Sequence, residues 1–166
     1  MGSIVGKGAD EGARLKAKFL AAVPALANLI DDLKAKFERD GFVRGLDGRK
    51  LYIGASKRVG RDGSERWERS LHKALNTLLQ SAGAIVMKKA LVILDERLQA
   101  EGLVPGEHYE FILNVHDEFG IECDEGLEER VGQMARQAII DAGVHFKMRC
   151  PLDGEYKLGS NWAQTH

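Results

Sequence analysis

The sequence predicts an α+β fold in which helices back an antiparallel sheet. Apolar residues recur at helical spacing before residue 41, again from about residue 71 to 98, and again from 126 to 142. Two apolar runs, 111–115 and 119–123, are separated by a short polar break, which is typical of a β-hairpin. Residues 144–150 then alternate strictly between apolar and polar, which predicts a further strand with one buried face.

The composition is that of a globular protein. Its 166 residues suit one domain or a large part of one, and 44% are hydrophobic and 30% charged. Because we find no secretory signal and no long uncharged apolar run, we expect a cytoplasmic protein with no membrane span. The formal net charge of −1 means that any nucleic-acid binding must come from local clusters of charge. Cys123 and Cys150 lie in alternating apolar runs, so we expect buried thiols, not a disulfide or a zinc site.

The first half of the chain predicts two helices and a hairpin. The first helix spans about residues 10–22, and the second begins at Pro24, which suits a first helical turn, and ends at Gly41. Residues 42–53 then predict a hairpin that turns on Asp47-Gly48.

A polar, locally basic segment follows, from residue 57 to 73. Gly60 and Gly63 interrupt it, so we expect a mobile loop. Such a loop is more often simply solvated, and contact with phosphate is the minority interpretation from charge alone. Its cationic residues include Lys57, Arg58 and Arg61.

The long helix expected at about 71–98 carries a line of polar residues among dense apolar ones. His72, Asn76 and Gln80 are spaced four residues apart and therefore lie along one side of the helix. One interpretation is an internal hydrogen-bond network, because buried amides need partners. The other is a row of amide donors facing the DNA minor groove, where every base pair presents acceptors.

The hairpin at 111–123 carries His116, Asp117 and Glu118 at its tip, where Asn-Gly or Asp-Gly would be usual. Two adjacent carboxylates at a rigid tip suit a hard cation such as magnesium, which takes oxygen ligands. A charged, solvated turn is an equally acceptable interpretation of the hairpin alone. Beyond it we expect a helix over about 126–142, with Gly143 as its C-cap, before the strand 144–150.

Four stretches, taken in order, resemble the C-terminal part of a family A DNA polymerase, and in particular those of short-tailed phages. Gly-Leu-Asp-Gly-Arg at 45–49 resembles the fingers hairpin of that family, and residues 72–84 resemble the helix that lies along the minor groove of the primer-template. Val-His-Asp-Glu at 115–118 resembles the third palm motif. The ending, with Gly159, Asn161-Trp162 and His166, resembles the family's C-terminus.

The resemblance implies distal fingers over residues 1–70 and a palm portion over 71–166. It implies that Asp117 is a ligand of two catalytic magnesium ions, with Glu118 beside them and His116 at the primer terminus. The implied partners are primer-template DNA and deoxynucleoside triphosphates. Asn76 and Gln80, with His72 next to them, would donate to the minor groove, and Lys57, Arg58 and Arg61 would approach the template backbone.

Two family motifs are not found in this sequence. We find neither an Asp-Tyr-Ser-like stretch with the second metal-binding aspartate nor the fingers helix whose Lys and Tyr-Gly grip the triphosphate. Met1 would then be an internal methionine of a longer polymerase or the first residue of a downstream piece of a split gene. We therefore expect the 166 residues to need the upstream part of the polymerase and to extend no primer alone.

Two other functions stay open. One is a remnant that binds duplex DNA without chemistry. The other is a metal-dependent nuclease built on Asp117 and Glu118, which is less favoured because a nuclease would need further carboxylates or a histidine base nearby.

Overall fold

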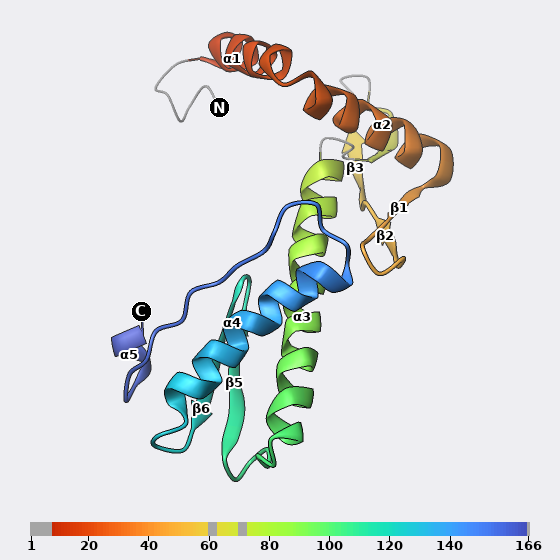
Figure 1. Ribbon diagram of the computed structural model, residues 1–166. Helices are drawn as coiled ribbons and strands as arrows, with labels where there is room; N and C mark the ends of the chain where they lie inside the picture. Colours follow the sequence, from red (N-terminus) through yellow and green to blue (C-terminus); the bar gives the residue numbers. More distant parts are fainter. Residues whose placement is uncertain (1–7, 60–62, 70–72, 166) are drawn as a thin grey trace. The chain divides into compact units, whose positions relative to one another are not determined.

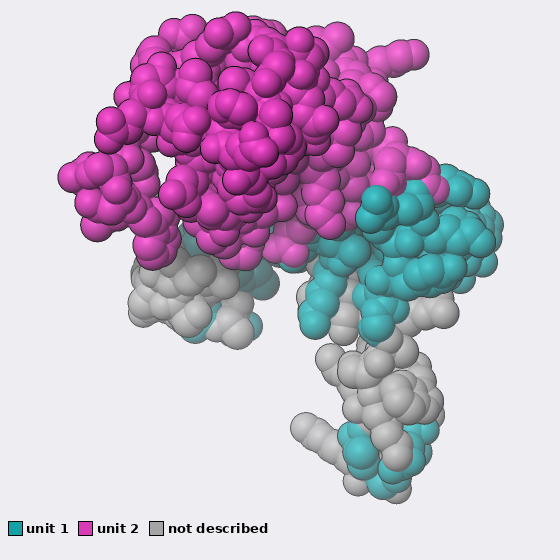
Figure 2. All heavy atoms as spheres, turned by 90° about the horizontal axis from the view of Figure 1, so that it is seen from below, with its two compact units in different colours: residues 1–45, 49–78 teal, residues 46–48, 79–166 magenta. Residues whose placement is uncertain are grey.

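The computed structural model describes residues 8–59, 63–69 and 73–165 (Figure 1). It combines helices with three two-stranded antiparallel sheets, as the predicted α+β class requires. The chain forms two compact units, one of residues 1–45 with 49–78 and the other of residues 46–48 with 79–166 (Figure 2). The division at residue 70 between fingers and palm stays a prediction.

The two N-terminal helices form as predicted. Helix α1 spans Ala9–Ala22, and helix α2 spans Pro24–Asp40 with its proline in the first turn. Gly41 follows α2 with φ of 77°, a left-handed conformation that glycine adopts without steric cost, and its amide donates to the Phe37 carbonyl. These residues therefore begin and end α2 where the sequence indicates.

The predicted hairpin after α2 is also confirmed. Strand β1, Phe42–Arg44, pairs with strand β2, Lys50–Tyr52, and Gly48 in the turn has φ of 83°. One face of this hairpin packs into a core within the first unit, and the buried members of that core are Leu33, Phe37, Val43, Ile53 and Ala74.

The expectation of a mobile loop over residues 57–73 is wrong for residues 57–59 and 65–69, which form strands. Strand β3, Ala55–Val59, pairs in antiparallel register with strand β4, Glu65–Arg69, so that Lys57 lies opposite Trp67 and Arg58 opposite Arg66. Gly63, one of the two glycines that suggested a mobile loop, precedes β4 with φ of 76°. Gly60 lies outside the described residues. The backbone ladder forms although each strand offers few apolar residues for a periodicity argument.

The long helix is confirmed as α3, Ala74–Ala100, and residues 79–100 of it belong to the second unit. Val86, Ala90, Leu94 and Leu98, spaced four residues apart, are buried in that unit's core. By length and composition alone α3 would suffice to cross a membrane, with mean hydropathy of 1.5 in its most apolar window. A buried core helix passes the same test, so this one helix is weak evidence for a span.

Strand β5, Tyr109–Val115, and strand β6, Glu118–Cys123, form the second unit's hairpin. Helix α4, Glu128–His145, follows, and it contributes Val131, Ala135, Ala138 and Ala142 to the same core as α3 and Tyr109. The α3–hairpin–α4 arrangement therefore forms one packed layer of helices against a short antiparallel sheet (Figure 1).

The predicted C-cap at Gly143 and strand at 144–150 are wrong. Gly143 is buried within α4, which ends at His145 with Phe146 as its C-cap. The left-handed residue is Lys147, with φ of 53°; its amide donates to the Val144 carbonyl, and the amide of Met148 donates to the Gly143 carbonyl at 2.9 Å. This pair of bonds is a Schellman motif with lysine in the position that glycine usually takes.

The tail after α4 runs back along that helix, an arrangement that periodicity did not indicate (Figure 1). A Cβ on Gly143 would lie 2.9 Å from Leu152 Cγ, and a Cβ on Gly154 would lie 2.7 Å from Ile139 Cδ1. An ion pair of 2.7 Å between Arg136 on α4 and Asp153 on the tail also holds the tail against the helix. Gly143 is thus needed for close approach of the tail, not for a helix cap. A short helix, α5, Trp162–Thr165, ends the described chain.

Candidate functional site

The tip of the β5–β6 hairpin is a two-residue turn. Val115 pairs directly with Glu118, so His116 and Asp117 alone make the connection and Glu118 already belongs to β6. His116 has φ of 53°, a region that non-glycine residues seldom adopt, although histidine enters it more often than most. Such strained residues cluster at active sites, where the surrounding structure fixes them.

All three tip side chains are exposed. His116, Asp117 and Glu118 lie on the surface of the second unit, so a ligand can reach them without movement of the chain. Within the described residues no group of three His, Cys, Asp or Glu side chains could hold a metal ion. The tip thus offers two neighbouring carboxylates, which is fewer ligands than a dedicated metal site would have.

Tyr109 ties the base of this hairpin to α3. Its ring is buried, and its hydroxyl donates to Asp95 Oδ1 at 2.5 Å, while Gln99 donates to the other carboxylate oxygen at 2.8 Å. Burial, followed by the Asp95 hydrogen bond, raises the pKa of Tyr109 to about 12. The ring also meets Phe111 edge to face, with centroids 5.7 Å apart. Sequence reasoning missed this tie, because residues fourteen apart on different elements share no local pattern.

Close packing inside the hairpin fixes its register. A Cβ at Gly120 would lie 3.2 Å from the Leu113 Cβ across the ladder, so only glycine leaves normal space there. A register shift lies between Phe111 and Leu113. The close packing at Gly120 and the register shift together restrict the orientation of the hairpin tip relative to its base.

The polar line on α3 faces solvent. Asn76 and Gln80 are both exposed one helical turn apart, and neither makes a hydrogen bond with the described part of the chain. The interpretation as an internal hydrogen-bond network is therefore wrong for these two residues. His72, the first of the line, lies outside the described residues.

Two of the three basic residues named from sequence lie on the β3–β4 hairpin. Lys57 and Arg58 are paired strand residues of β3, and Arg61 lies outside the described residues.

The expectation of buried thiols is wrong for Cys150, which is exposed because the expected strand does not form. Cys123 is half-buried, and burial and the nearby Glu128 raise the pKa of its thiol. Both cysteines are free thiols.

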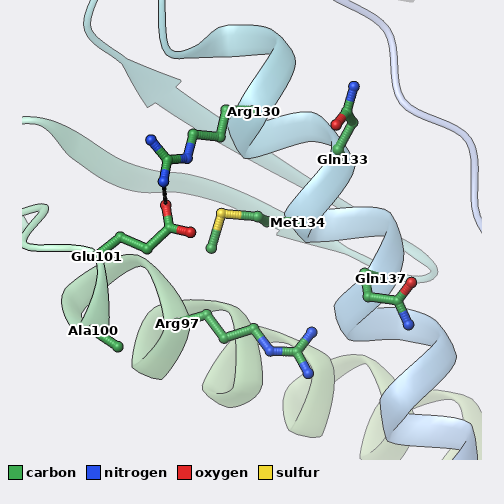
Figure 3. Close-up of a pocket in the computed structure, with 7 residues that line it drawn as sticks. All are labelled: Arg97, Ala100, Glu101, Arg130, Gln133, Met134 and Gln137. Carbon is green, nitrogen blue, oxygen red and sulfur yellow. Dashed lines mark ion pairs between the residues drawn. The ribbon is translucent and has the colours of Figure 1, made fainter.

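A surface pocket lies elsewhere in the second unit, between the end of α3 and α4 (Figure 3). Its volume is about 530 Å³, Met134 projects into it, and an Arg130–Glu101 ion pair of 2.6 Å crosses it. None of the site residues predicted from sequence lines it. The pocket is therefore separate from the hairpin tip.

Comparison with known proteins identifies the class of fold and then the family. A solved structure described as the POL domain of Pol1 from M. smegmatis, in complex with DNA primer-template and dNTP, superimposes with a TM-score of 0.69 over 85% of this chain and 24% of that chain, at 21% identity. The likeness shows a polymerase-domain fold. The family model for DNA polymerase family A matches residues 3–164, so the chain belongs to DNA polymerase family A.

The most similar relatives include phage enzymes. A DNA-directed DNA polymerase of Escherichia phage Phieco32 is 36% identical over 100% of this chain and 25% of the relative. That of Escherichia phage T7 is 35% identical over 100% of this chain and 24% of the relative, and DNA polymerase I of Pseudomonas aeruginosa is 32% identical over 90% and 15%. The chain thus spans about a quarter of the length of the phage relatives that it matches.

Proposed function

We propose that this chain is a C-terminal piece of a DNA-directed DNA polymerase and supplies part of its active site, which carries out template-directed nucleotidyl transfer in DNA replication by a two-metal mechanism. The observation that supports the proposal best is the two-residue turn His116-Asp117, exposed on a rigid hairpin in a chain that matches family A from residue 3 to 164. Its partners would be primer-template DNA and deoxynucleoside triphosphates, and its place of action the cytoplasm of the cell that holds that DNA.

The donor set at the tip fits magnesium in part. Carboxylate oxygens are the ligands that Mg²⁺ takes from proteins, usually one or two of them with water and substrate phosphates filling the other positions. Asp117 would hold the metal, and Glu118 would stand beside the site. When two magnesium ions are bound, they supply activation of the primer 3′-hydroxyl and charge stabilisation at the triphosphate.

The chain's own residues would position the reactants. His116, held by its unusual backbone conformation next to Asp117, would contact the primer terminus. Asn76 and Gln80, exposed on α3 and without hydrogen bonds to the described residues, would donate to minor-groove acceptors near the growing end. Lys57, Arg58 and Arg61 would approach the template backbone, where phosphate contacts position DNA without reading sequence.

This chain would need a second polypeptide segment for chemistry. The described residues offer no third metal-binding side chain near the tip, and the relatives are about four times as long as this chain. Two carboxylates alone bind magnesium weakly and do not hold two ions. We therefore expect no primer extension by the isolated chain.

A chimeric polymerase tests the catalytic assignment. The segment of the phage T7 relative that this chain matches would be replaced by residues 1–166, and primer extension would be measured. Asp117→Asn should lower the rate about 10³-fold or more, because the metal contribution is worth several kcal/mol. Asp124→Asn, at the other end of β6, is the matched control. Equal activity of the two variants would refute the assignment.

A second candidate is a duplex DNA-binding protein without chemistry, and the exposed amides of α3 favour it. Binding of the whole chain to a fully base-paired DNA duplex should be weakened by Asn76→Ala and by Gln80→Ala. Gln99→Ala on the same helix should not weaken it. The chimera separates the candidates: binding without any extension in the chimera would leave only the non-catalytic function.

A further inference from the structure

The β1–β2 hairpin has two chemically different faces. Val43 and Ile53 belong to the buried core of the first unit, with Leu51 packed against it. The residues between them alternate to the other side, because successive strand side chains point to opposite faces. The outer face comprises Phe42, Arg44, Lys50 and Tyr52, which are cross-strand partners in the register Phe42↔Tyr52 and Arg44↔Lys50.

The outer face is a compact cluster of rings and cations. The Phe42 and Tyr52 rings are 6.0 Å apart at an interplanar angle of 53°. Lys50 Nζ lies 4.6 Å from the Phe42 centroid and Arg44 Cζ lies 5.7 Å from it, so both cations are gathered around one ring. Tyr52 is 65% exposed, which leaves its ring open to a ligand.

This face carries positive charge in a chain whose net charge is −1. Residues 42–53 contain the cations Arg44, Arg49 and Lys50 against the single acid Asp47. The exposed ring of Tyr52 lies on the same face as two cross-strand cations, Arg44 and Lys50. This combination is complementary to a ligand that has both flat aromatic faces and negative charges. An acidic peptide would use the cations and leave the ring unused, and a small anion would do the same.

We propose that the outer face of the β1–β2 hairpin binds single-stranded DNA, with a base stacked on Tyr52 and adjacent phosphates held by Lys50 and Arg44. Sites for single strands combine aromatic platforms with a cationic groove, and they are tolerant of sequence because every base has a π-face. In a duplex the faces of the bases are already stacked on one another, so this face selects unpaired strands. In the proposed polymerase the ligand would be template that has not yet been copied, a contact separate from Asp117 and from the minor-groove amides.

Binding of a fluorescent oligothymidylate of about a dozen nucleotides to the whole chain tests the proposal. Tyr52→Leu keeps an apolar, strand-forming side chain but removes the ring, and it should weaken binding about 5- to 150-fold, the range equivalent to the ~1–3 kcal/mol of one base–aromatic stack. Tyr52→Phe is the matched control and should bind as the wild type does. Duplex of the same length should bind equally to all three proteins.

A second variant tests the proposed phosphate contact of Lys50 and leaves Tyr52 unchanged. Lys50→Gln should weaken oligothymidylate binding and flatten the dependence of log affinity on log salt by about 0.7, the contribution of one phosphate contact on a single strand. Asp124→Asn, at a residue with no role in either proposal, should leave oligothymidylate binding unchanged. Because this assay measures binding and not extension, failure of this proposal stays distinguishable from failure of the catalytic one. Unaltered binding by both Tyr52→Leu and Lys50→Gln would overturn the assignment of this face.

Discussion

Replacing Tyr109 by phenylalanine isolates the hydrogen bond that ties the β5–β6 hairpin to α3. The ring stays in the core, and only the hydroxyl that donates to Asp95 at 2.5 Å is lost. A hydrogen bond to a charged group contributes about 1.5–3 kcal/mol to stability. Because Asp95 is half-buried and keeps its bond from Gln99, water can replace the lost donor, and we expect the lower end, about 1.5 kcal/mol.

Native-state hydrogen exchange of the β5 and β6 amides is the suitable assay, because it reports the free energy of unfolding for this unit alone. The matched control is Tyr156→Phe, which removes a hydroxyl that donates to Glu129 at 2.5 Å on the exposed side of α4. We expect a smaller loss there because water screens and replaces an exposed bond. An unchanged β5–β6 protection in Tyr109→Phe, or a larger loss in Tyr156→Phe, would refute this account of the hairpin's anchor.

The same residue gives a dependence on pH with a definite sign. The pKa of Tyr109 is raised from 10.0 to about 12, chiefly by burial, so the folded state keeps its proton between those values while the unfolded state loses it. Its contribution to stability is therefore complete below pH 10 and is lost as the pH rises through about 12. Tyr109→Phe should flatten the stability curve over this interval. A wild-type curve that rises there would contradict the assignment.

Four further substitutions test the packing of the helices and the tail. Gly132→Ala should lower the free energy of unfolding in urea by about 1–2 kcal/mol, because a Cβ there would lie under 3 Å from the Tyr156 ring. Gly83→Ala has nothing within 4 Å of the new Cβ, so it should raise the free energy of unfolding by about 1 kcal/mol through helix propensity alone. Lys147→Gly should raise the thermal midpoint, since it relieves a left-handed φ of 53° that costs roughly 1 kcal/mol. The Arg136 guanidinium lowers the pKa of Asp153 to about 2, so Asp153→Asn should reduce protection of the tail amides at neutral pH, and the difference from wild type should vanish as the pH falls through about 2.

The elements that sequence predicted correctly are those whose local signals agree with their tertiary role. Pro24 and Gly41 mark the ends of α2 because they occupy the helix positions that their backbone restrictions favour. Gly143 failed as a signal because a glycine serves either a left-handed backbone or close packing, and only the position of Leu152 decides which. The residues after it alternate by chance, since Phe146 and Leu152 join the core from an irregular segment and no strand partner exists among the described elements.

The site was predictable to a similar degree. The break between two apolar runs locates the hairpin tip, but periodicity does not reveal that Glu118 lies within β6 or that His116 has a positive φ. The four-residue spacing of Asn76 and Gln80 places both on one side of α3, yet the sequence alone does not settle whether that side is buried. The cross-strand cluster on Tyr52 also needed the register of the β1–β2 pair.

Primer extension by two separate polypeptides tests whether Asp117 completes an active site with an upstream segment. This chain would be mixed with the remaining segment of the phage T7 relative, primer-template DNA, magnesium and nucleotides. We expect no templated addition by either polypeptide alone, addition by the mixture, and loss of that addition with Asp117→Ala. Extension by the 166 residues alone, or extension by the mixture that survives Asp117→Ala, would contradict this expectation.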